Sequence, residues 1–434
     1  RVGFLSAHFR WHSVGRLTVA LLEELSSSSR ELKVFVVDAS IERRSSLVQQ
    51  PGPAVRDTFH GDSVESAGNR ALHAARETIA ALKLDVLVYG DVGMDAFTTA
   101  LAHSRLSPVQ VAFWGHPGTT GLPTMDYFLT SDSFEPKARK DKGDSRARTC
   151  RDDYTSVDEP EACAWGNVNN RQDAYAEQLV RLGGLGFLFD DPIRTFRGGG
   201  RLEHAPRLSP GGFAGAASPE TVKGETVVDV NRPRLYICAQ SLMKMHPAFD
   251  AVLVGILAAD PLAQVVLLRD SRQLLWHSRF RRRLREAPGQ FWSRVRFVSP
   301  LSGRDFFRLQ CRADVVLDPF PFGGGVTTLE ALACGTPVVT AGALQSVHHL
   351  AEGMIAAVAE TNDMLVLSLV AETASEYVAK AVAVAAPGEL KERVRRALRC
   401  GRDGLLQGGG GDVAMDWESF LTRAAASANT DAYV

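Results

Sequence analysis

The sequence lacks an apolar run of the roughly 20 residues that a membrane-spanning helix needs, so no membrane partner is expected. It also lacks an excess of charge of either sign, because 49 Lys and Arg residues stand against 50 Asp and Glu residues. With no overall positive field, nucleic acid is not an expected partner either. Hydrophobic residues make up 45% and charged residues 23% of the 434, which is ordinary for a globular protein and excludes a largely disordered chain.

Paired cysteine motifs are absent as well. The six cysteines are scattered, with no C-x-x-C pair and no His and Cys cluster at ligand spacing. This pattern predicts a reducing compartment, cytoplasmic or nuclear, and no structural zinc. The adjacent His348 and His349 have no carboxylates at ligand spacing, so we expect a structural pair and no metal site.

The chain begins at Arg1, directly on a strand-like segment, with neither an initiator Met nor a signal peptide. We therefore expect a piece of a longer protein. Its 434 residues are enough for two domains of roughly 150–200 residues each.

Short apolar runs rich in β-branched residues alternate with amphipathic stretches in two parts of the chain. The first part has expected strands at 1–6, 32–37 and 84–89, and expected helices at 15–25 and 66–83. The second part has expected strands at 234–238, 264–268, 295–298, 315–317 and 338–340, with helices beginning near His246, Ser271, Arg304 and Val326. This alternation predicts an α/β fold with parallel sheets covered by helices.

Composition divides these two parts. The segment 137–172 is basic, then acidic, and poor in apolar residues, which predicts a disordered insertion, although a docking site for an acidic partner is an alternative. We predict an N-terminal Rossmann-like domain at 1–190 that carries this insertion. A linker follows at 191–232, and a second Rossmann-like domain at 233–434 ends in C-terminal helices.

The most informative motif is VVLDPFPFGGGVTTLEALACGTPVVT at 315–340. Gly323, Gly324 and Gly325 allow close approach of a ligand and positive φ angles. The helix beginning near Val326 offers unpaired N–H groups and a positive dipole end, which together suit a diphosphate. Glu330, one turn further on, is placed to accept hydrogen bonds from a ribose diol. The alternative is a tight strand–helix turn with a solvated Glu.

This motif resembles the donor site of GT-B glycosyltransferases, and it is most similar to the O-linked N-acetylglucosamine transferase/SPINDLY family. Four further segments resemble that family in the same order. They are SAHFRWHSVGRL around His12, DVGMDAFTTALAHSRLSPVQVAFWGHPGTTG at 91–121, CAQSLMKMHP at 238–247 and SPLSGR at 299–304. The resemblance implies two Rossmann-like domains whose parallel sheets face each other across a cleft. The N-terminal domain would be on the acceptor side, and the C-terminal one would bind the nucleotide sugar. The C-terminal helices would pack back toward the N-terminal domain.

Two residues are expected to be catalytic by this resemblance. Lys244 matches the family's phosphate-binding lysine, where a compact cation stabilises the departing diphosphate without a metal. His12 matches the family's catalytic-site His, which would bind donor or acceptor or act as general base. The alternatives are a surface Lys and a structural His whose ring nitrogens bind backbone groups.

The remaining candidates are donor-binding residues. His116 stands where the family usually has an aromatic residue, so we expect a pocket wall. Arg304 stands at a family Lys beside the base, and a solvated Arg at a helix start is equally open. The full set of predicted donor-binding residues is Gly115, His116, Gln240, Ser241, Ser302, Arg304, Gly323, Gly324, Gly325, Val326, Thr327, Thr328 and Glu330.

Three departures from the family leave the donor open. Gly325 comes before Val326 and the paired Thr residues, where the O-GlcNAc transferases have a His. Phe307 replaces another His, and 93–95 (Gly-Met-Asp) replaces a Tyr-Thr-Lys element near the sugar.

The resemblance implies transfer of N-acetylglucosamine from UDP-GlcNAc to Ser or Thr hydroxyls of a protein. It implies inversion at the sugar carbon and no metal or other cofactor. O-fucosyl transfer from GDP-fucose is an alternative, as are a degenerate, non-catalytic nucleotide-sugar-binding module and a different GT-B enzyme. Tetratricopeptide (TPR) repeats that present the acceptor are expected to precede this region in the full-length protein.

Overall fold

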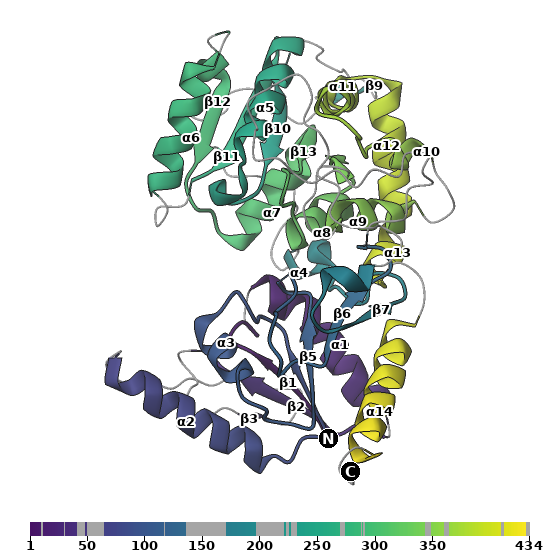
Figure 1. The fold of residues 1–434 in the computed structure, drawn as a ribbon. Helices are drawn as coiled ribbons and strands as arrows, with labels where there is room; N and C mark the ends of the chain where they lie inside the picture. The colour runs from purple at the N-terminus through teal and green to yellow at the C-terminus, as the bar shows by residue number, and fades with distance from the viewer. Residues whose placement is uncertain are drawn as a thin grey trace, which may run out of the picture. The chain divides into compact units, whose positions relative to one another are not determined.

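The structure is a computed structural model. It describes residues 1–9, 12–29, 31–40, 48–49, 65–116, 118–135, 171–196, 221–222, 225–226, 232–269, 274–287, 289, 291–342, 349–359, 364–408 and 412–430. The predicted insertion at 137–172 therefore falls almost wholly outside the described residues. The described residues form two compact units (Figure 1).

The first unit is built on a seven-stranded sheet. Its strands, in spatial order, are β3 (Val48–Gln49), β2 (Val34–Asp38), β1 (Val2–Ser6), β4 (Val86–Tyr89), β5 (Val109–Phe113), β6 (Tyr127–Ser131) and β7 (Gln178–Leu182). Helices α1 (Ser13–Ser28), α2 (Glu65–Ala81), α3 (Ala96–Ala102) and α14 (Val413–Thr430) and the short helix η2 (Arg171–Ala174) complete the unit. Every residue of β1, β4 and β5 is buried, which explains why these strands are continuous apolar runs in the sequence.

All neighbouring strands in this sheet run parallel except the β2–β3 pair at its edge. The sequence analysis expected a parallel sheet and did not foresee the antiparallel edge strand. β3 is two residues long, too short for a periodic pattern to be visible.

The last helix, α14, belongs to the first unit, which agrees with the expectation that the C-terminal helices pack back toward the N-terminal domain. The predicted domain boundaries, 233–434, had placed it in the second domain. Trp417 anchors it, with its ring centroid 5.7 Å from that of Phe4 and 5.1 Å from that of Phe113. The indole N–H of Trp417 donates to the backbone oxygen of Gly186 at 2.9 Å. In Figure 1 the yellow ribbon of α14 lies beside the purple ribbon of α1, in agreement with the contacts between the two helices.

The second unit is built on a five-stranded parallel sheet. The strands, in spatial order, are β12 (Val295–Val298), β11 (Ala263–Leu268), β10 (Arg234–Cys238), β13 (Val315–Leu317) and β14 (Val338–Val339). The strand order reverses between β10 and β13, so the chain leaves these two neighbouring strands toward opposite faces of the sheet. Such a switch point is where open α/β sheets bind ligands.

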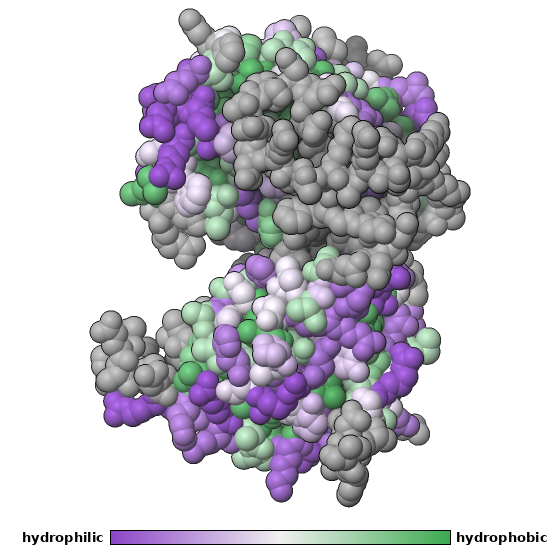
Figure 2. Space-filling model, viewed as in Figure 1, coloured by the Kyte–Doolittle hydropathy of each residue, from purple (hydrophilic) through white to green (hydrophobic). Residues whose placement is uncertain are grey.

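The helices of the second unit and a small hairpin surround this sheet (Figure 1). The helices are α4 (Pro192–Phe196), η3 (Leu242–Lys244), α5 (Pro247–Ala259), α6 (Leu274–Glu286), η4 (Phe291–Arg294), α7 (Gly303–Arg312), α8 (Val326–Ala333), α9 (Leu350–Val358), α10 (Met364–Leu367), α11 (Ala374–Ala385), α12 (Glu389–Cys400) and α13 (Arg402–Leu406), and the hairpin pairs β8 (Thr221–Val222) with β9 (Glu225–Thr226). Figure 2 shows hydrophilic residues gathered over α6, whose buried side chains are Phe280 and Leu284.

The α/β class predicted from the sequence is confirmed by these two sheets. The segment at 191–232, predicted as a linker, contains α4 and the β8–β9 hairpin. No helix in the described ranges combines the length and apolar character that a bilayer crossing requires.

Candidate functional site

The site of the second unit lies at the carboxyl ends of β10 and β13, the two strands at the switch point. β10 leads into η3, which ends at Lys244, and β13 leads through a glycine-rich turn into α8. Tyr236 pairs with Val315 and Ile237 with Val316 across the two strands. This register brings the two loops to the same edge of the sheet although about 80 residues separate them.

The side chain of Lys244 reaches the glycine-rich turn. Its Nζ donates to the backbone oxygen of Gly323 and to Oε1 of Gln240, each at 2.9 Å. The ammonium also lies 4.5 Å from the ring centroid of Phe322. The structure therefore brings the predicted phosphate-binding lysine and the predicted glycine turn together. The alternative, a solvated surface lysine, is excluded.

Burial lowers the pKa of Lys244 to about 8, and the nearby carboxylate of Asp318 opposes that decrease. The amine is still a cation at neutral pH, although its environment favours the neutral form. A charge that the fold keeps against its own burial is typical of functional sites, because selection for stability alone would remove it.

Gln240 connects the lysine to helix α8. Its Nε2 donates to Oγ1 of Thr327 while its Oε1 accepts from Lys244. The side chain of Gln240 is buried, as is that of Thr328, the next residue along α8. Ser241 precedes η3 and acts through its backbone oxygen, which accepts the N–H of Lys244 at 3.0 Å.

The turn requires glycine because side chains of the protein itself fill the space around it. A Cβ on Gly323 would lie 2.6 Å from Oδ2 of Asp318, and one on Gly324 would lie 2.8 Å from Oγ1 of Thr327 and overlap Gln240. The expectation of positive φ angles is wrong here, since these glycines are not among the residues with positive φ and Gly325 has a φ of −108°. Gly325 also has room, with Leu350 Cδ1 nearest at 3.8 Å.

Helix α8 starts at Val326 directly after this turn. No side chain in the described residues caps it, because the N-cap position is Gly325. The first N–H groups of a helix have no intrahelical acceptor, so they are available to an anion together with the positive dipole end. Lys244 and the N-terminus of α8 thus converge on one turn, an arrangement that can bind a diphosphate.

Sequence reasoning missed Asp318, which follows β13. Its side chain is buried at 2% exposure, and it accepts the N–H of Gly324 at 2.6 Å and the hydroxyl of Thr340 at 2.7 Å. Burial raises the pKa of this carboxyl to about 6, and the two hydrogen bonds and the charge of Lys244 moderate that increase. A signal was present, because an acidic residue directly after a buried parallel strand lies at the edge where ligands bind.

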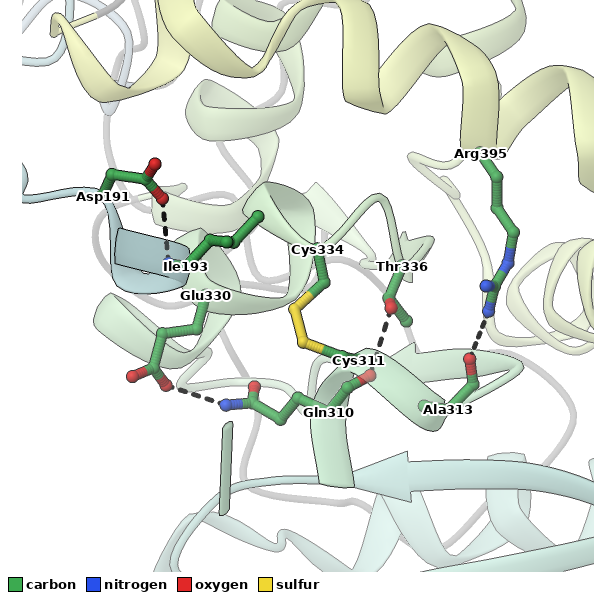
Figure 3. Close-up of a disulfide and its surroundings, with 9 residues drawn as sticks. All are labelled: Asp191, Ile193, Gln310, Cys311, Ala313, Glu330, Cys334, Thr336 and Arg395. Carbon is green, nitrogen blue, oxygen red and sulfur yellow. Dashed lines mark hydrogen bonds between the residues drawn. A yellow bond between two sulfur atoms is a disulfide. The ribbon is translucent and has the colours of Figure 1, made fainter. Parts of the chain in front are cut away.

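Glu330 is buried in the second turn of α8, at 2% exposure. Its Oε2 accepts from Nε2 of Gln310 on α7 at 2.7 Å, as Figure 3 shows. The solvated Glu that we considered as an alternative is therefore excluded. Its ribose role stays a prediction, since one carboxylate can hold Gln310 and still accept another donor.

A disulfide joins α7 to α8 beside this pair. Cys311 and Cys334 are bonded across 23 residues of sequence, and their Cα atoms lie 5.1 Å apart (Figure 3). The expectation of reduced cysteines is wrong for these two, because the packing of the two helices brings together cysteines that are unrelated in the sequence. Cys238 and Cys400 are free.

The predicted base-side residues have partners within the second unit. Arg304 donates from Nε and Nη2 to the backbone oxygen of Phe196, the last residue of α4, at 3.2 and 3.0 Å. The ring of Phe196 stacks on that of Phe307 with centroids 5.0 Å apart. The exposed Ser302 is the N-cap of α7 and accepts the N–H of Asp305 at 3.1 Å. These residues anchor α4 and start α7, and their contact with a base stays a prediction.

In the first unit, His12 is the N-cap of α1. Its Nδ1 accepts the N–H of Val14 at 3.4 Å, and its ring stacks on that of His8 with centroids 4.2 Å apart. His12 therefore makes one of the hydrogen bonds to backbone groups that the alternative of a structural histidine predicts. With Nδ1 facing the helix, Nε2 is the nitrogen through which His12 would act as a base.

Gly115 and His116 follow β5, at the edge of the first sheet where the carboxyl end of β1 also lies. A Cβ on Gly115 would overlap the backbone oxygen of Gly90, so only glycine fits there. The ring of His116 lies against the turn at Gly93, where an added Cβ would lie 3.2 Å from it. This position agrees with a wall residue.

Asp91 is a second acidic residue that sequence reasoning did not single out. It follows β4 and is buried, with Oδ2 accepting from the hydroxyl of Ser6 at 2.9 Å and the N–H of Ala7 at 2.8 Å. Burial raises the pKa of Asp91, while the two hydrogen bonds and His8 act in the opposite direction. It fixes the loop that leads from β1 toward His12.

No cluster of three or more His, Cys, Asp or Glu side chains suited to a metal ion is found within the described part of the chain. His349 pairs through Nδ1 with Oε2 of Glu352 at 2.9 Å, whereas His348 lies outside the described residues.

No protein-family model matches the chain. It is similar to curated proteins described as probable UDP-N-acetylglucosamine–peptide N-acetylglucosaminyltransferase SPINDLY. The one from Solanum lycopersicum is 26% identical over 410 residues, which cover 92% of this chain and 36% of that protein. It is also similar to the UDP-glucose:protein N-beta-glucosyltransferase of Actinobacillus pleuropneumoniae serotype 5b, at 22% identity over 420 residues, 90% of this chain and 54% of that one.

Among solved structures, a mutant O-GlcNAc transferase of Thermobaculum terrenum superposes with a TM-score of 0.61 at 20% identity. The match covers 100% of this chain and 68% of that one, and it shows a common fold. The chain spans about a third of the length of the SPINDLY proteins that it matches, as the 36% coverage above shows.

Proposed function

We propose that this chain, which belongs to the O-GlcNAc transferase/SPINDLY family and has its GT-B fold, is the catalytic region of a protein glycosyltransferase. The observation that carries the proposal is the position of Lys244 Nζ, which lies 2.9 Å from the backbone oxygen of Gly323 at the start of α8. A cation, a glycine turn and a helix N-terminus that meet at one point suit a nucleotide diphosphate.

The reaction is the transfer of a sugar to a protein hydroxyl by a single displacement. The acceptor oxygen attacks the anomeric carbon, the bond from that carbon to the diphosphate oxygen breaks, and the configuration inverts. The diphosphate gains negative charge as it departs, and Lys244 and the first N–H groups of α8 stabilise that charge. No metal takes part in this scheme. The acceptor proton goes to a general base, for which His12 is the candidate in the first unit.

The proposed donor is UDP-GlcNAc, and the proposed acceptor is a Ser or Thr side chain. The nucleotide would be held through its diphosphate at Lys244 and Gly323–Thr328 and through its ribose at Glu330. GDP-fucose is the alternative donor. The Actinobacillus relative is named for UDP-glucose, which makes that sugar nucleotide a third candidate.

The relatives' greater length supports a longer full-length protein, in which TPR repeats present the acceptor. A cytoplasmic or nuclear location is proposed on the family resemblance alone, since the Cys311–Cys334 disulfide is more typical of an oxidising compartment.

A thermal-shift panel of UDP, GDP, UDP-GlcNAc, UDP-glucose and GDP-fucose tests the proposal. Stabilisation by UDP and UDP-GlcNAc, with hydrolysis or transfer of the sugar, is the expected result. Selective stabilisation by GDP and GDP-fucose would replace the donor. Binding without any turnover toward water or protein would indicate a non-catalytic module, and no response to any nucleotide would contradict the proposal.

A further inference from the structure

We propose that Asp318 is a positioning residue of the diphosphate site, which fixes the glycine turn and provides a buried countercharge for Lys244 before a donor binds. The inference rests on the proposed function for the identity of the ligand. It assigns a role to a residue that does not itself touch the donor.

The geometry places Asp318 at the centre of the turn. It follows the last residue of β13, and its Oδ1 accepts the N–H of Gly324 at 2.6 Å. Its Oδ2 accepts the hydroxyl of Thr340, which follows β14, at 2.7 Å. One carboxylate therefore ties the ends of two neighbouring strands to the turn that precedes α8.

The turn is built closely around this carboxylate. A Cβ on Gly323 would lie 2.6 Å from Oδ2 and 2.9 Å from Oδ1 of Asp318. The backbone of Gly323 can approach that closely only without a side chain, and its oxygen then faces Nζ of Lys244. The position of the lysine acceptor thus depends on where Asp318 holds the turn.

Three titratable groups face Asp318 from the elements around it. Lys244 comes from η3, Cys238 from β10 and Tyr377 from α11, whose hydroxyl donates to the backbone oxygen of Asp318 at 3.0 Å. Burial raises the pKa of the Cys238 thiol and of the Tyr377 phenol, and the charge of Asp318 raises both further. Both groups are therefore neutral at physiological pH, and Lys244 is the countercharge among the three.

The pKa of Asp318 is raised to about 6 and that of Lys244 is lowered to about 8. Both groups are charged between these values, and the carboxylate favours the ammonium form of Lys244. Of the three N–H bonds of that ammonium, the described residues accept two, at Gly323 and Gln240. The third N–H of Lys244 is the one that would donate to a phosphate oxygen of the donor.

The variant Asp318→Asn separates charge from shape. An asparagine retains one oxygen for the N–H of Gly324 but has no charge, so the pKa of Lys244 should fall by about one unit. A decrease of that size lowers the charged fraction of Lys244 about fivefold at pH 8 and by less than a third at pH 6.5. Asp318→Asn should therefore bind UDP about fivefold more weakly than wild type at pH 8, and within about twofold at pH 6.5.

Asp314→Asn is the matched control. Asp314 is equally buried and precedes the same strand, β13, where it pairs with Arg232 and Lys391 at the opposite end from the turn. This variant should be less stable but should show the wild-type pH dependence of UDP binding by calorimetry. An equal loss of affinity at both pH values in Asp318→Asn would mean structural damage and would overturn the proposal.

A ligand-free measurement distinguishes failure of this proposal from failure of the proposed function. Competitive labelling with acetic anhydride, read by mass spectrometry, gives the pKa of Lys244 in each folded variant. A decrease in Asp318→Asn but not in Asp314→Asn supports the positioning role even if neither UDP nor GDP binds, a result that would contradict only the diphosphate site. An unchanged pKa of Lys244 in Asp318→Asn overturns the positioning role.

The wild-type protein provides the test if the variant does not fold. The ¹³C shift of Lys244 Cε should show two steps, near pH 6 as Asp318 ionises and near pH 8 as the amine deprotonates. A single step at the pH of an ordinary lysine would contradict the proposal.

Discussion

Replacing Lys244 by Met distinguishes a lysine that serves the reaction from one that serves the fold. Met has a similar length and is apolar, so the variant removes the charge and the two hydrogen bonds to Gly323 and Gln240 while it fills the same space. We expect almost unchanged stability and a large loss of turnover.

The expected stability change follows from the pKa. Because the folded-state pKa of Lys244 is about 8 against 10.5 in the unfolded chain, keeping it charged costs about 3 kcal/mol below pH 8. That penalty disappears as the pH rises from about 8 to 10.5. A neutral amine would also make the two hydrogen bonds to Gly323 and Gln240, and at about 1 kcal/mol each they offset about 2 kcal/mol of it. Lys244→Met should therefore change the free energy of unfolding at pH 7 by no more than about 1 kcal/mol.

The effect on the reaction is expected to be much larger. Loss of one preorganised contact to the departing diphosphate costs roughly 3–4 kcal/mol of transition-state stabilisation, or about 10²–10³-fold in turnover. The assay is transfer of sugar from UDP-GlcNAc to an acceptor protein, or donor hydrolysis, measured alongside urea unfolding of the same samples.

Lys391→Met is the matched control. Lys391 is 5% exposed, pairs with Asp314 and donates to the backbone oxygen of Ala385 at 3.1 Å. Its removal leaves a buried carboxylate with one partner fewer, which should lower the free energy of unfolding by about 3 kcal/mol without changing turnover per folded molecule. If Lys244→Met instead loses stability and activity in the same proportion as Lys391→Met, Lys244 is a structural residue and the argument fails.

Three further variants test other parts of the site. Gly324→Ala should weaken UDP binding by about tenfold or more because its methyl group would displace Gln240, and an unchanged affinity would refute the packing argument. Glu330→Gln should lower UDP and GDP affinity about tenfold through loss of a charged hydrogen bond to the ribose, and unchanged calorimetric affinity would exclude that role. Cys334→Ser should lower the free energy of unfolding by about 3 kcal/mol in denaturant titrations, and wild-type protein under reducing conditions should show the same loss.

The second sheet, and strands β1, β2 and β4 of the first, were predictable from the sequence because their signal is local. Strands such as β4 and β10 are buried on both faces and are therefore continuous apolar runs. The start of α8 at Val326 was predictable for a related reason, since a glycine turn between a strand and a largely apolar helical segment defines a helix N-terminus. The proximity of Lys244 to this turn was expected only from the family resemblance, because 79 residues of sequence separate Lys244 from Gly323.

The features that were missed depend on packing between distant segments. Nothing near Asp318 in the sequence shows that Thr340 and Gly324 will donate to it. The pairing of Cys311 with Cys334 requires α7 and α8 to lie side by side. The reason for the glycines differs also, because the turn needs them to accommodate neighbouring side chains, and not for a left-handed backbone.

A crystal structure of the chain with UDP tests the central claim most directly. The account predicts the diphosphate at the N-terminus of α8, with an oxygen at about 2.8 Å from Nζ of Lys244 and others facing the N–H groups after Gly325. A diphosphate bound elsewhere, with Lys244 still donating only to Gly323 and Gln240, would contradict it.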